Sequence, residues 1–360
     1  MKILHIVEDF SVGSGGLRTV IKNLDFYLKS IGFDSFILSS KKEYEDEIFI
    51  VNSRNKWLYS KKWVNEIDNI VKHYNIDVIH IHGVWLYPQL VGAKYAIVNK
   101  KPLVLSAHGM YQPWLWKKGT LKKKIYFNLL SKKWFSKATL IHTITANETK
   151  SIKYFLNNKE IVEIPNLITV VERNEKYQSS EKYILYLGRL NKSKGIDLLI
   201  RAFAQVNNQN IKFKIAGEFN KYKKELESLI NSLNLANKVE FLSLVKNEQK
   251  KELIRNSWVM VAPTYSDVIG MVNLEAASLR TPIITTYNTG LDSGWNKNGG
   301  KLINPNVEEL KTALDEVLKW TIEERNLYGQ KLFNFVKDHY SWESRLIDWR
   351  NLYEKAVNHD

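Results

Sequence analysis

VAPTYSDVIGMVNLEAASLRTPIITTYNTG, residues 261–290, is the stretch of sequence that decides the fold class. Its apolar start ends at Pro263, as a buried parallel strand does before a crossover connection. Gly270 opens a helical pattern, MVNLEAASLR, which ends before Pro282 because proline disfavours helical geometry in the residue that precedes it. Residues 283–286 are β-branched and read as the next strand. Strand, loop, helix and strand in this order predict a parallel α/β unit.

Two acidic residues stand in this unit, Asp267 in the loop and Glu275 in the helix. In α/β proteins, anionic ligands bind where a loop meets a helix N-terminus at the carboxyl edge of the sheet. The two acids are therefore candidate ligand-binding groups. A plainer interpretation is also open, in which Asp267 caps the helix and Glu275 complements its dipole.

The same alternation of strands and helices fills the rest of the chain. In the first half, we predict helices at 17–32 and 64–74 and strands at 3–7, 36–39, 77–81, 103–107, 140–145 and 161–164. In the second half, we predict helices at 195–206 and 222–233 and strands at 183–188, 213–217, 239–242 and 258–262. The pattern predicts two doubly wound domains, 1–170 and 183–340, a polar linker at 171–182 and a C-terminal helix at 341–360 opened by Ser341.

The composition agrees with two packed domains. The chain has 360 residues, and its 53 basic and 38 acidic side chains give a net charge of +15. Residues 101–147 hold nine lysines and no acid, which suits an acidic substrate, an anionic membrane or nucleic acid.

The absence of cysteine excludes disulfides and thiolate chemistry. Because no apolar run reaches the roughly 18 residues of a membrane span and no signal peptide is recognisable, we expect a cytoplasmic protein.

Glycine and histidine mark the ends of predicted strands in the first half. Gly13, Gly15 and Gly16 follow the first strand, where backbone amides can approach a phosphate or sugar because no Cβ intervenes. The dinucleotide fingerprint GxGxxG is not present, because Arg18 stands at its last glycine. An ordinary strand-to-helix turn is the alternative interpretation.

Two later strands end in His-Gly, at His82-Gly83 and His108-Gly109. Imidazoles placed there can donate hydrogen bonds to phosphate or sugar oxygens at the carboxyl edge. His80 shares a strand face with His82, but no carboxylate stands close in the sequence. We therefore expect a core histidine at His80 and no metal site.

Two basic features of the chain are also candidates. Arg189 and Lys194 flank a turn into a helix, where two cations can hold a diphosphate without a metal, although solvated surface charges are the alternative. Residues 117–137, KKGTLKKKIYFNLLSKKWFSK, combine eight lysines with an apolar face at helical spacing. Such a helix suits an anionic membrane or a lipid-carried acceptor, and a core helix with a solvated lysine face is equally compatible. No RNP or zinc-finger pattern accompanies it, so nucleic acid is not expected.

In order and spacing, these residues together resemble glycosyltransferase family 4, the group 1 glycosyltransferases, which are retaining enzymes with the GT-B fold. The resemblance runs from the glycine turn through both His-Gly strand ends and Ile164-Pro165-Asn166 to GRLNKSKGIDLLIRAF and DVIGMVNLEA. The family pattern is Glu, seven residues, Glu, and Asp267 replaces the first Glu. This departure bears on the donor-sugar contact and not on the fold.

The resemblance implies two Rossmann-like domains with a cleft between them, a nucleotide-sugar donor, and no metal or cofactor. It implies that Arg189 and Lys194 hold the diphosphate, that Asp267 orients the donor sugar and that His108 lies beside that sugar. Further donor contacts are implied for Gly15, Gly16, Gly270, Met271, Val272 and, on the ribose, Glu275. On the acceptor side we place His82, Lys122, Lys123, Lys124 and Trp134.

We therefore expect a retaining glycosyltransferase that uses a UDP- or GDP-linked sugar. Its expected acceptor is a glycan, in particular a lipid-linked intermediate of bacterial O-antigen, capsule or exopolysaccharide synthesis at the inner face of the cytoplasmic membrane. Two rivals are a GT-B-like sugar-nucleotide epimerase, which needs paired acids for proton abstraction, and a sugar-nucleotide-binding subunit without catalysis. The substitution at Asp267 favours the second rival.

Overall fold

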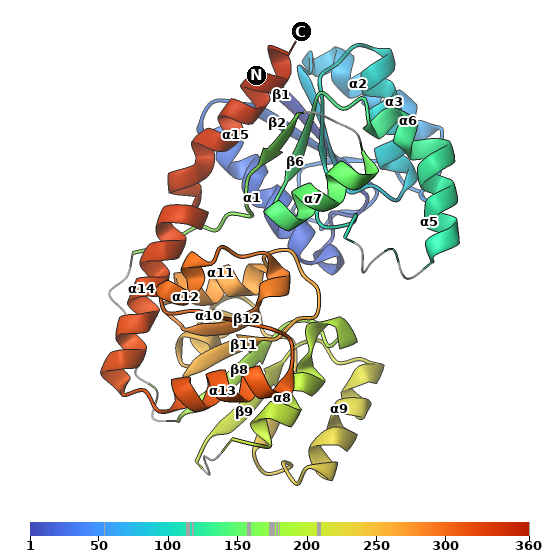
Figure 1. The fold of residues 1–360 in the computed structure, drawn as a ribbon. Helices are drawn as coiled ribbons and strands as arrows, with labels where there is room; N and C mark the ends of the chain where they lie inside the picture. The colour runs from blue at the N-terminus through green and yellow to red at the C-terminus, as the bar shows by residue number, and fades with distance from the viewer. Residues whose placement is uncertain are drawn as a thin grey trace. The chain divides into compact units, whose positions relative to one another are not determined.

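The computed structural model describes residues 1–53, 55–112, 116, 119–156, 160–172, 177, 179, 181–206 and 210–359. The chain divides into two compact units, Met1–Asn166 with Arg345–Asp360, and Leu167–Ser344. Each unit contains one parallel sheet with helices on both faces (Figure 1). This confirms the α/β class. Of the predicted linker 171–182, residues 173–176, 178 and 180 lie outside the described residues.

The first unit has a seven-stranded sheet with the order β3-β2-β1-β4-β5-β6-β7. Its strands are β1 (Lys2–Ile6), β2 (Asp34–Ser39), β3 (Phe49–Ile50), β4 (Val78–His82), β5 (Leu103–Ser106), β6 (Leu140–Thr143) and β7 (Ile161–Glu163). Its helical segments are α1 (Gly16–Ser30), α2 (Lys62–Tyr74), α3 (Tyr87–Val98), α5 (Thr120–Tyr126), η2 (Phe127–Ser131), α6 (Lys132–Phe135), α7 (Ala146–Phe155) and, from Arg345 on, α15 (Trp342–Val357).

The second unit has a six-stranded sheet with the order β10-β9-β8-β11-β12-β13. Its strands are β8 (Tyr183–Leu187), β9 (Lys212–Ala216), β10 (Val239–Leu242), β11 (Val259–Ala262), β12 (Ile283–Thr286) and β13 (Lys301–Ile303). Its helices are α8 (Ile196–Phe203), α9 (Lys221–Ser232), α10 (Asn247–Arg255), α11 (Met271–Ser278), α12 (Gly294–Lys297), α13 (Val307–Leu318) and α14 (Ile322–Tyr340), with the short η3 (Lys192–Lys194) before α8.

Apolar periodicity explains how these elements pack. In α1, Val20, Leu24 and Leu28 recur every four residues and are buried against the sheet. The strands β4, β5 and β8 are buried along their whole length, as expected for parallel strands covered on both faces. Ser341 opens α15 as predicted, because its Oγ accepts a hydrogen bond from the Ser344 amide. No helix among the described residues has the length and apolarity that crossing a bilayer requires.

Arg325 on α14 ties that helix to the middle of the second unit. Its side chain is buried, and its guanidinium donates to four backbone carbonyls, at 2.8–3.3 Å, of Arg255, Ser257, Trp258 and Arg280. The same group lies over the Tyr177 ring at 4.6 Å. Burial lowers the pKa of Arg325 to about 10, so the guanidinium stays charged at neutral pH. One cation thus satisfies the carbonyls where α10, β11 and α11 end or begin.

Replacing Arg325 with Met should lower the free energy of unfolding by about 3 kcal/mol, because several buried carbonyls lose their donors together. Urea unfolding followed by tryptophan fluorescence measures this change. Arg201→Met on the exposed face of α8 is the matched control and should change stability by less than about 0.5 kcal/mol. Equal stability of the two variants would show that the carbonyl contacts of Arg325 do not stabilise the unit.

Candidate functional site

The loop between β11 and α11 has a strained backbone. Ile269 has φ of 59° and Gly270 has φ of 68°. A β-branched residue at positive φ is an outlier, and such strain gathers at functional sites. It is held by the burial of the Ile269 side chain and by its amide, which donates to Thr289 O at 2.7 Å. The sequence offers no sign of this strain, because positive φ is usual for glycine and not for isoleucine.

The N-cap of α11 is Gly270, which makes no side-chain cap, and the Gly270 amide donates to Val268 O at 2.6 Å. The expected ligand contact of the Gly270 amide is therefore wrong, and the amides of Met271 and Val272 are left at this helix end. The interpretation of Asp267 as a helix cap is also wrong. Its Oδ1 accepts from the neighbouring Val268 amide at 3.0 Å, and its Oδ2 lies 2.5 Å from Lys194 Nζ. A cation and an anion thus meet beside the positive end of a helix dipole.

The loops after β8 and β11 are fixed to each other. The Thr264 hydroxyl and the Tyr265 amide both donate to Ser193 O, at 3.0 and 2.9 Å. Gly195 has φ of 66°, and a Cβ at this position would lie 2.1 Å from Pro263 O, so only glycine permits this approach. The contact places Lys194 against the second loop, whereas Arg189 is exposed on its own loop.

Glu275 lines a cavity of about 340 Å³ in the second unit. Its Oε2 lies 2.6 Å from Lys250 Nζ, and both side chains are partly exposed, at 23% and 29%. The cavity runs between α10, α11 and the chain that enters the unit, and it is lined by Ile168, Thr169, Val171, Asn247, Lys250, Lys251, Ile254, Arg255, Glu275, Ser278, Leu279 and Arg280. The site therefore combines one carboxylate with several cations.

In the first unit, the glycine turn is open. A Cβ at Gly15 or Gly16 would meet no atom within 4 Å, and Gly15 has φ of 68°. The turn leads from β1 into α1, at the carboxyl edge of the sheet. The backbone there is accessible, as the glycine pattern predicts.

A chain of buried hydrogen bonds crosses the same sheet. His142 Nε2 lies 2.8 Å from Ile164 O, and because a carbonyl only accepts, the proton is on Nε2. His142 Nδ1 therefore accepts from the Ser106 hydroxyl at 2.7 Å. Ser106 in turn accepts from His80 Nε2 at 2.7 Å, and His80 Nδ1 accepts from the Tyr353 hydroxyl of α15 at 2.7 Å. His80 is thus a core histidine, as predicted, with both nitrogens engaged.

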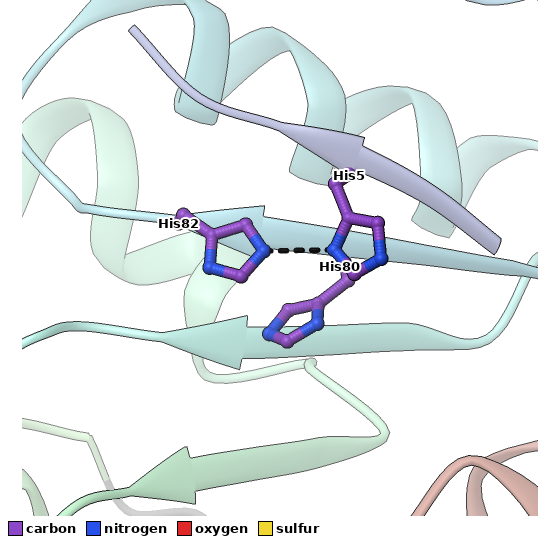
Figure 2. A group of neighbouring side chains, drawn as sticks. All are labelled: His5, His80 and His82. Carbon is purple, nitrogen blue, oxygen red and sulfur yellow. Dashed lines mark hydrogen bonds between the residues drawn. The ribbon is translucent and has the colours of Figure 1, made fainter. Parts of the chain in front are cut away.

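A second chain of imidazoles runs beside the first. His5 Nδ1 lies 2.9 Å from His82 Nε2, and His82 Nδ1 lies 2.9 Å from His108 Nε2. Figure 2 shows the first of these bonds and the rings of His5, His80 and His82 on adjacent strands. Burial lowers the pKa of His5 to about 4 and that of His108 to about 3, so these rings are neutral at pH 7.

His5, His80 and His82 form the one histidine group among the described residues close enough to hold a metal ion, with nitrogens within 4.8 Å of one another. Both nitrogens of His80 and the facing nitrogens of His5 and His82 are already hydrogen-bonded. A metal would have to break these bonds, so the donor set fits a hydrogen-bonded core better than a metal centre.

Glu148 positions the backbone next to His108. Its carboxylate is buried and accepts from the amides of Gly109 and Ile144. His108 has φ of 51° and Gly109 has φ of 77°. Positive φ is unfavourable for a residue other than glycine, so the Glu148 carboxylate holds the turn at its strained position. Burial raises the pKa of Glu148 to about 7.

The basic-aromatic helix contains α5, η2 and α6, and Lys117 and Lys118 of the predicted stretch lie outside the described residues. Phe127 and Phe135 are buried, so one face belongs to the core. The outer face exposes large aliphatic side chains, Leu121, Ile125, Leu129 and Leu130, at 73%, 50%, 75% and 42%. Lys122 and Lys124 are exposed, Lys123 lies over the Trp85 ring, and Trp134 is partly buried beneath Lys94 and Lys133. A face that is both apolar and basic is thus open to solvent.

Two family models match successive parts of the chain, Glycosyltransferase Family 4 at residues 14–171 and Glycosyl transferases group 1 at residues 170–331. The chain belongs to this glycosyltransferase family. The recognition made from the sequence motifs is confirmed.

Relatives and solved structures agree with this assignment. An uncharacterized glycosyltransferase of Methanocaldococcus jannaschii is 26% identical over 355 residues, 95% of each chain. A second from the same organism is 32% identical over 184 residues, 50% of this chain but only 46% of that protein. HepE of Anabaena, solved in complex with UDP-glucose, superposes with a TM-score of 0.78 at 17% identity, covering 98% of this chain and 100% of that one. That likeness confirms the GT-B fold.

The glycosyltransferase holds several site residues that the sequence did not reveal. Lys250 comes from α10 to pair with Glu275, and nothing in the sequence links the two helices. His5 and His142 could have been found, because each lies in a predicted strand on the face that carries His80 and Ser106. The sequence around Glu148 indicates only the start of a helix, because Glu148 stands three residues after the N-cap Thr145.

Acidification should destabilise the first unit of this glycosyltransferase between pH 6.5 and about 4. His5, His108 and His142 have pKa values lowered to about 4, 3 and 4 in the folded state, so unfolding takes up protons below 6.5. Stability is complete above the unfolded pKa and is lost as pH falls, by up to about 1.4 kcal/mol per pH unit for each histidine.

The free energy of unfolding in urea is measured at each pH and compared between variants. Glu8 and Glu148, whose pKa values are raised, contribute in the opposite sense, and their contributions cancel in this comparison. His142→Asn should weaken the pH dependence, and His73→Gln, on the exposed side of α2, should leave it as in the wild type. An unchanged pH dependence in His142→Asn would contradict the neutral buried network.

Proposed function

We propose that the protein is a retaining, metal-independent glycosyltransferase that moves a sugar from a nucleotide diphosphate, UDP- or GDP-linked, to a lipid-linked glycan. The observation that carries the donor half is the meeting of Lys194 and Asp267 at the uncapped N-terminus of α11. Such a helix end with a lysine beside it attracts a diphosphate. Arg189, on the same loop as Lys194, supplies a second cation.

The leaving diphosphate gains negative charge as the glycosidic bond to the donor breaks. Lys194, Arg189 and the amides of Met271 and Val272 stabilise that charge without a metal ion, whereas the Gly270 amide donates to Val268 O. The departing phosphate takes the acceptor proton, so no protein base is assigned. Asp267 is left to orient donor-sugar hydroxyls, and His108 lies beside the transferred sugar.

Glu275 binds the ribose of the donor in this scheme. The cavity of about 340 Å³ beside it accommodates the nucleoside, with Glu275 and Lys250 as its polar groups. The UDP-glucose complex of the structurally similar HepE supports a uridine donor. Because Asp267 and Glu275 have separate lysine partners, they do not form the carboxylate pair that an epimerase needs.

The acceptor half rests on the outer face of α5 and η2. Exposed Leu121, Ile125 and Leu129 repeat every four residues, and Lys122 and Lys124 stand among them. An apolar stripe rimmed by lysines binds the interface of an anionic membrane, where lipid-linked glycans are found. This face supports a peripheral membrane enzyme, and surface-polysaccharide synthesis in a bacterium is the setting that we propose for it.

Glu275→Ala should weaken nucleotide-sugar binding at least about tenfold, because a hydrogen bond to a charged group is lost. Calorimetric titration with UDP-glucose and GDP-mannose measures the affinity and also decides the base. Glu316→Ala removes a similar glutamate, 2.6 Å from Lys301 and outside the cavity, and should bind as the wild type does. A large fall in melting temperature for Glu275→Ala alone would make Glu275 structural.

Reversing Lys122, Lys123 and Lys124 to Glu should reduce binding to phosphatidylglycerol vesicles by more than about 100-fold, and salt should weaken wild-type binding. The matched control replaces Lys221, Lys223 and Lys224 of α9 with Glu. It changes the net charge by the same amount, at positions with the same pattern of exposure. Sedimentation with vesicles measures both. Equal loss in the two variants would show that only net charge matters and that the helix is not the membrane site.

A further inference from the structure

Five aromatic side chains gather at the surface of the first unit, apart from the residues assigned to the donor. This aromatic platform consists of Trp57, Tyr59, Trp85, Tyr87 and Tyr126. The ring centroids of its contacting members lie 4.8–6.3 Å apart. Tyr59 is 48% exposed, and the other four rings are partly exposed. Large apolar side chains that stay together at a surface indicate a binding site.

The turn at residues 55–59 presents two of these rings. Asn55 Oδ1 accepts from the amides of Trp57 and Tyr59, at 3.2 and 2.9 Å, and Asn55 Nδ2 donates to Tyr59 O at 2.8 Å. Leu58 has φ of 59°, which is unfavourable for a residue other than glycine, and its carbonyl accepts from the buried Trp63 indole at 3.0 Å. The Trp57 and Tyr59 rings are nearly parallel, with 6° between their planes. Strain held by tertiary contacts is typical of functional segments.

The platform lies close along the chain to the proposed sugar site. The Tyr87 amide donates to Trp57 O at 3.1 Å, which fixes the turn to the start of α3. His82 ends β4 at the carboxyl edge of the sheet, and Tyr87 stands five residues later. Five residues span at most about 18 Å, so a short oligosaccharide can extend from the platform to His82 and to His108, whose ring lies 2.9 Å from that of His82.

Tyr126 of α5 connects the platform to the outer face of α5 and η2. Its ring centroid lies 6.2 Å from those of Trp57 and Trp85. Lys123, three residues earlier, lies over the Trp85 ring at 5.3 Å, so a cation already covers that ring. The platform is therefore continuous with the apolar and basic face of this helix. A glycan on a lipid held at that face can reach the platform.

The remaining rings offer two kinds of contact to a ligand. Each has an apolar face and also a polar edge, which is the Trp57 indole N–H or the hydroxyl of Tyr59 or Tyr87. These three polar groups make no hydrogen bond within the part of the chain that the structure describes. A pyranose ring has C–H groups on a face and hydroxyls at its rim, so it matches a ring face with donors at the edge. An acyl chain would leave these donors unpaired.

We propose that the aromatic platform binds neutral sugars of an oligosaccharide acceptor, beyond the sugar that receives the transferred residue. The role of this ligand as acceptor rests on the proposed function, but the binding of a neutral oligosaccharide does not. A glycan of several sugars can contact the platform and the transfer site together, whereas a single sugar cannot. The platform therefore favours the extension of an existing glycan over the addition of a first sugar.

Labelling with 5-fluorotryptophan allows the platform to be observed by ¹⁹F NMR in the full-length protein. Trp57→Phe removes one of the 11 tryptophans and so assigns the Trp57 signal. The probes are cellotetraose and chitotetraose, which are neutral and present apolar ring faces. We expect both to shift the Trp57 signal at concentrations at which glucose and N-acetylglucosamine do not. A Trp57 signal that neither tetrasaccharide moves would overturn the inference, and this measurement on the wild type does not depend on the folding of a variant.

Trp57→Ala and Tyr59→Ala test the two rings of the turn. Each should weaken tetrasaccharide binding about fivefold or more, as measured by saturation-transfer NMR on the sugar, because a stacking contact is lost. Trp57→Phe keeps a ring and should retain most of the affinity. Tyr154→Ala is the matched control, because Tyr154 is 84% exposed in the same unit and contacts Phe155 edge-on. Equal affinity in Trp57→Ala, Tyr154→Ala and the wild type would contradict the proposal.

A membrane is the other occupant that the position beside α5 allows. Trp57→Ala and Tyr59→Ala should sediment with phosphatidylglycerol vesicles as the wild type does. Loss of vesicle binding with unchanged affinity for the tetrasaccharides would assign the rings to the membrane and refute glycan binding. If the tetrasaccharides bind at Trp57 but no sugar is transferred from UDP- or GDP-sugars, the proposed function fails and the platform remains a glycan-binding site.

Discussion

Parallel pairing of the strands places the loops that leave β1, β4 and β5 at one edge of the first sheet, and those that leave β8 and β11 at one edge of the second. Most of the candidate site residues depend on this constraint, because the glycine turn, His82, His108, Arg189, Lys194 and Asp267 end or follow these strands, whereas Lys250 and Glu275 lie in helices. The register also aligns His5 with His80, His82 with Ser106 and Ser106 with His142. Polar side chains therefore form a continuous chain on one face of a sheet that is otherwise apolar.

The two units differ in how their polar side chains are paired and buried. In the second, each carboxylate of the candidate site has a lysine of its own, and the pairs are partly exposed, so a phosphate can compete for the cations without leaving a buried charge behind. In the first, burial keeps the histidines neutral, and hydrogen bonds rather than charges determine their orientation. In the proposed function, the donor diphosphate occupies the environment of the second unit and the neutral sugar that of the first.

The sequence predicted most of the fold, since long buried strands and amphipathic helices carry clear periodicity. The edge strands β3 and β13, with two and three residues, are too short to show a pattern. At the site, Lys194, Asp267 and Glu275 were recognisable from motif spacing. Their partners were not, because Lys250 of α10 meets Glu275 of α11 only in the folded structure, where the Ile269 amide also donates to Thr289 O. Such residues are set by tertiary contacts that no local pattern encodes.

The most direct measurement follows a UDP-sugar with ¹³C at its anomeric carbon, incubated with the protein and a lipid-linked glycan acceptor. The proposed function predicts a new ¹³C signal of a glycosidic bond that depends on the acceptor and keeps the anomeric configuration of the donor. An inverted anomer, or an epimeric UDP-sugar formed without acceptor, would contradict a retaining glycosyltransferase.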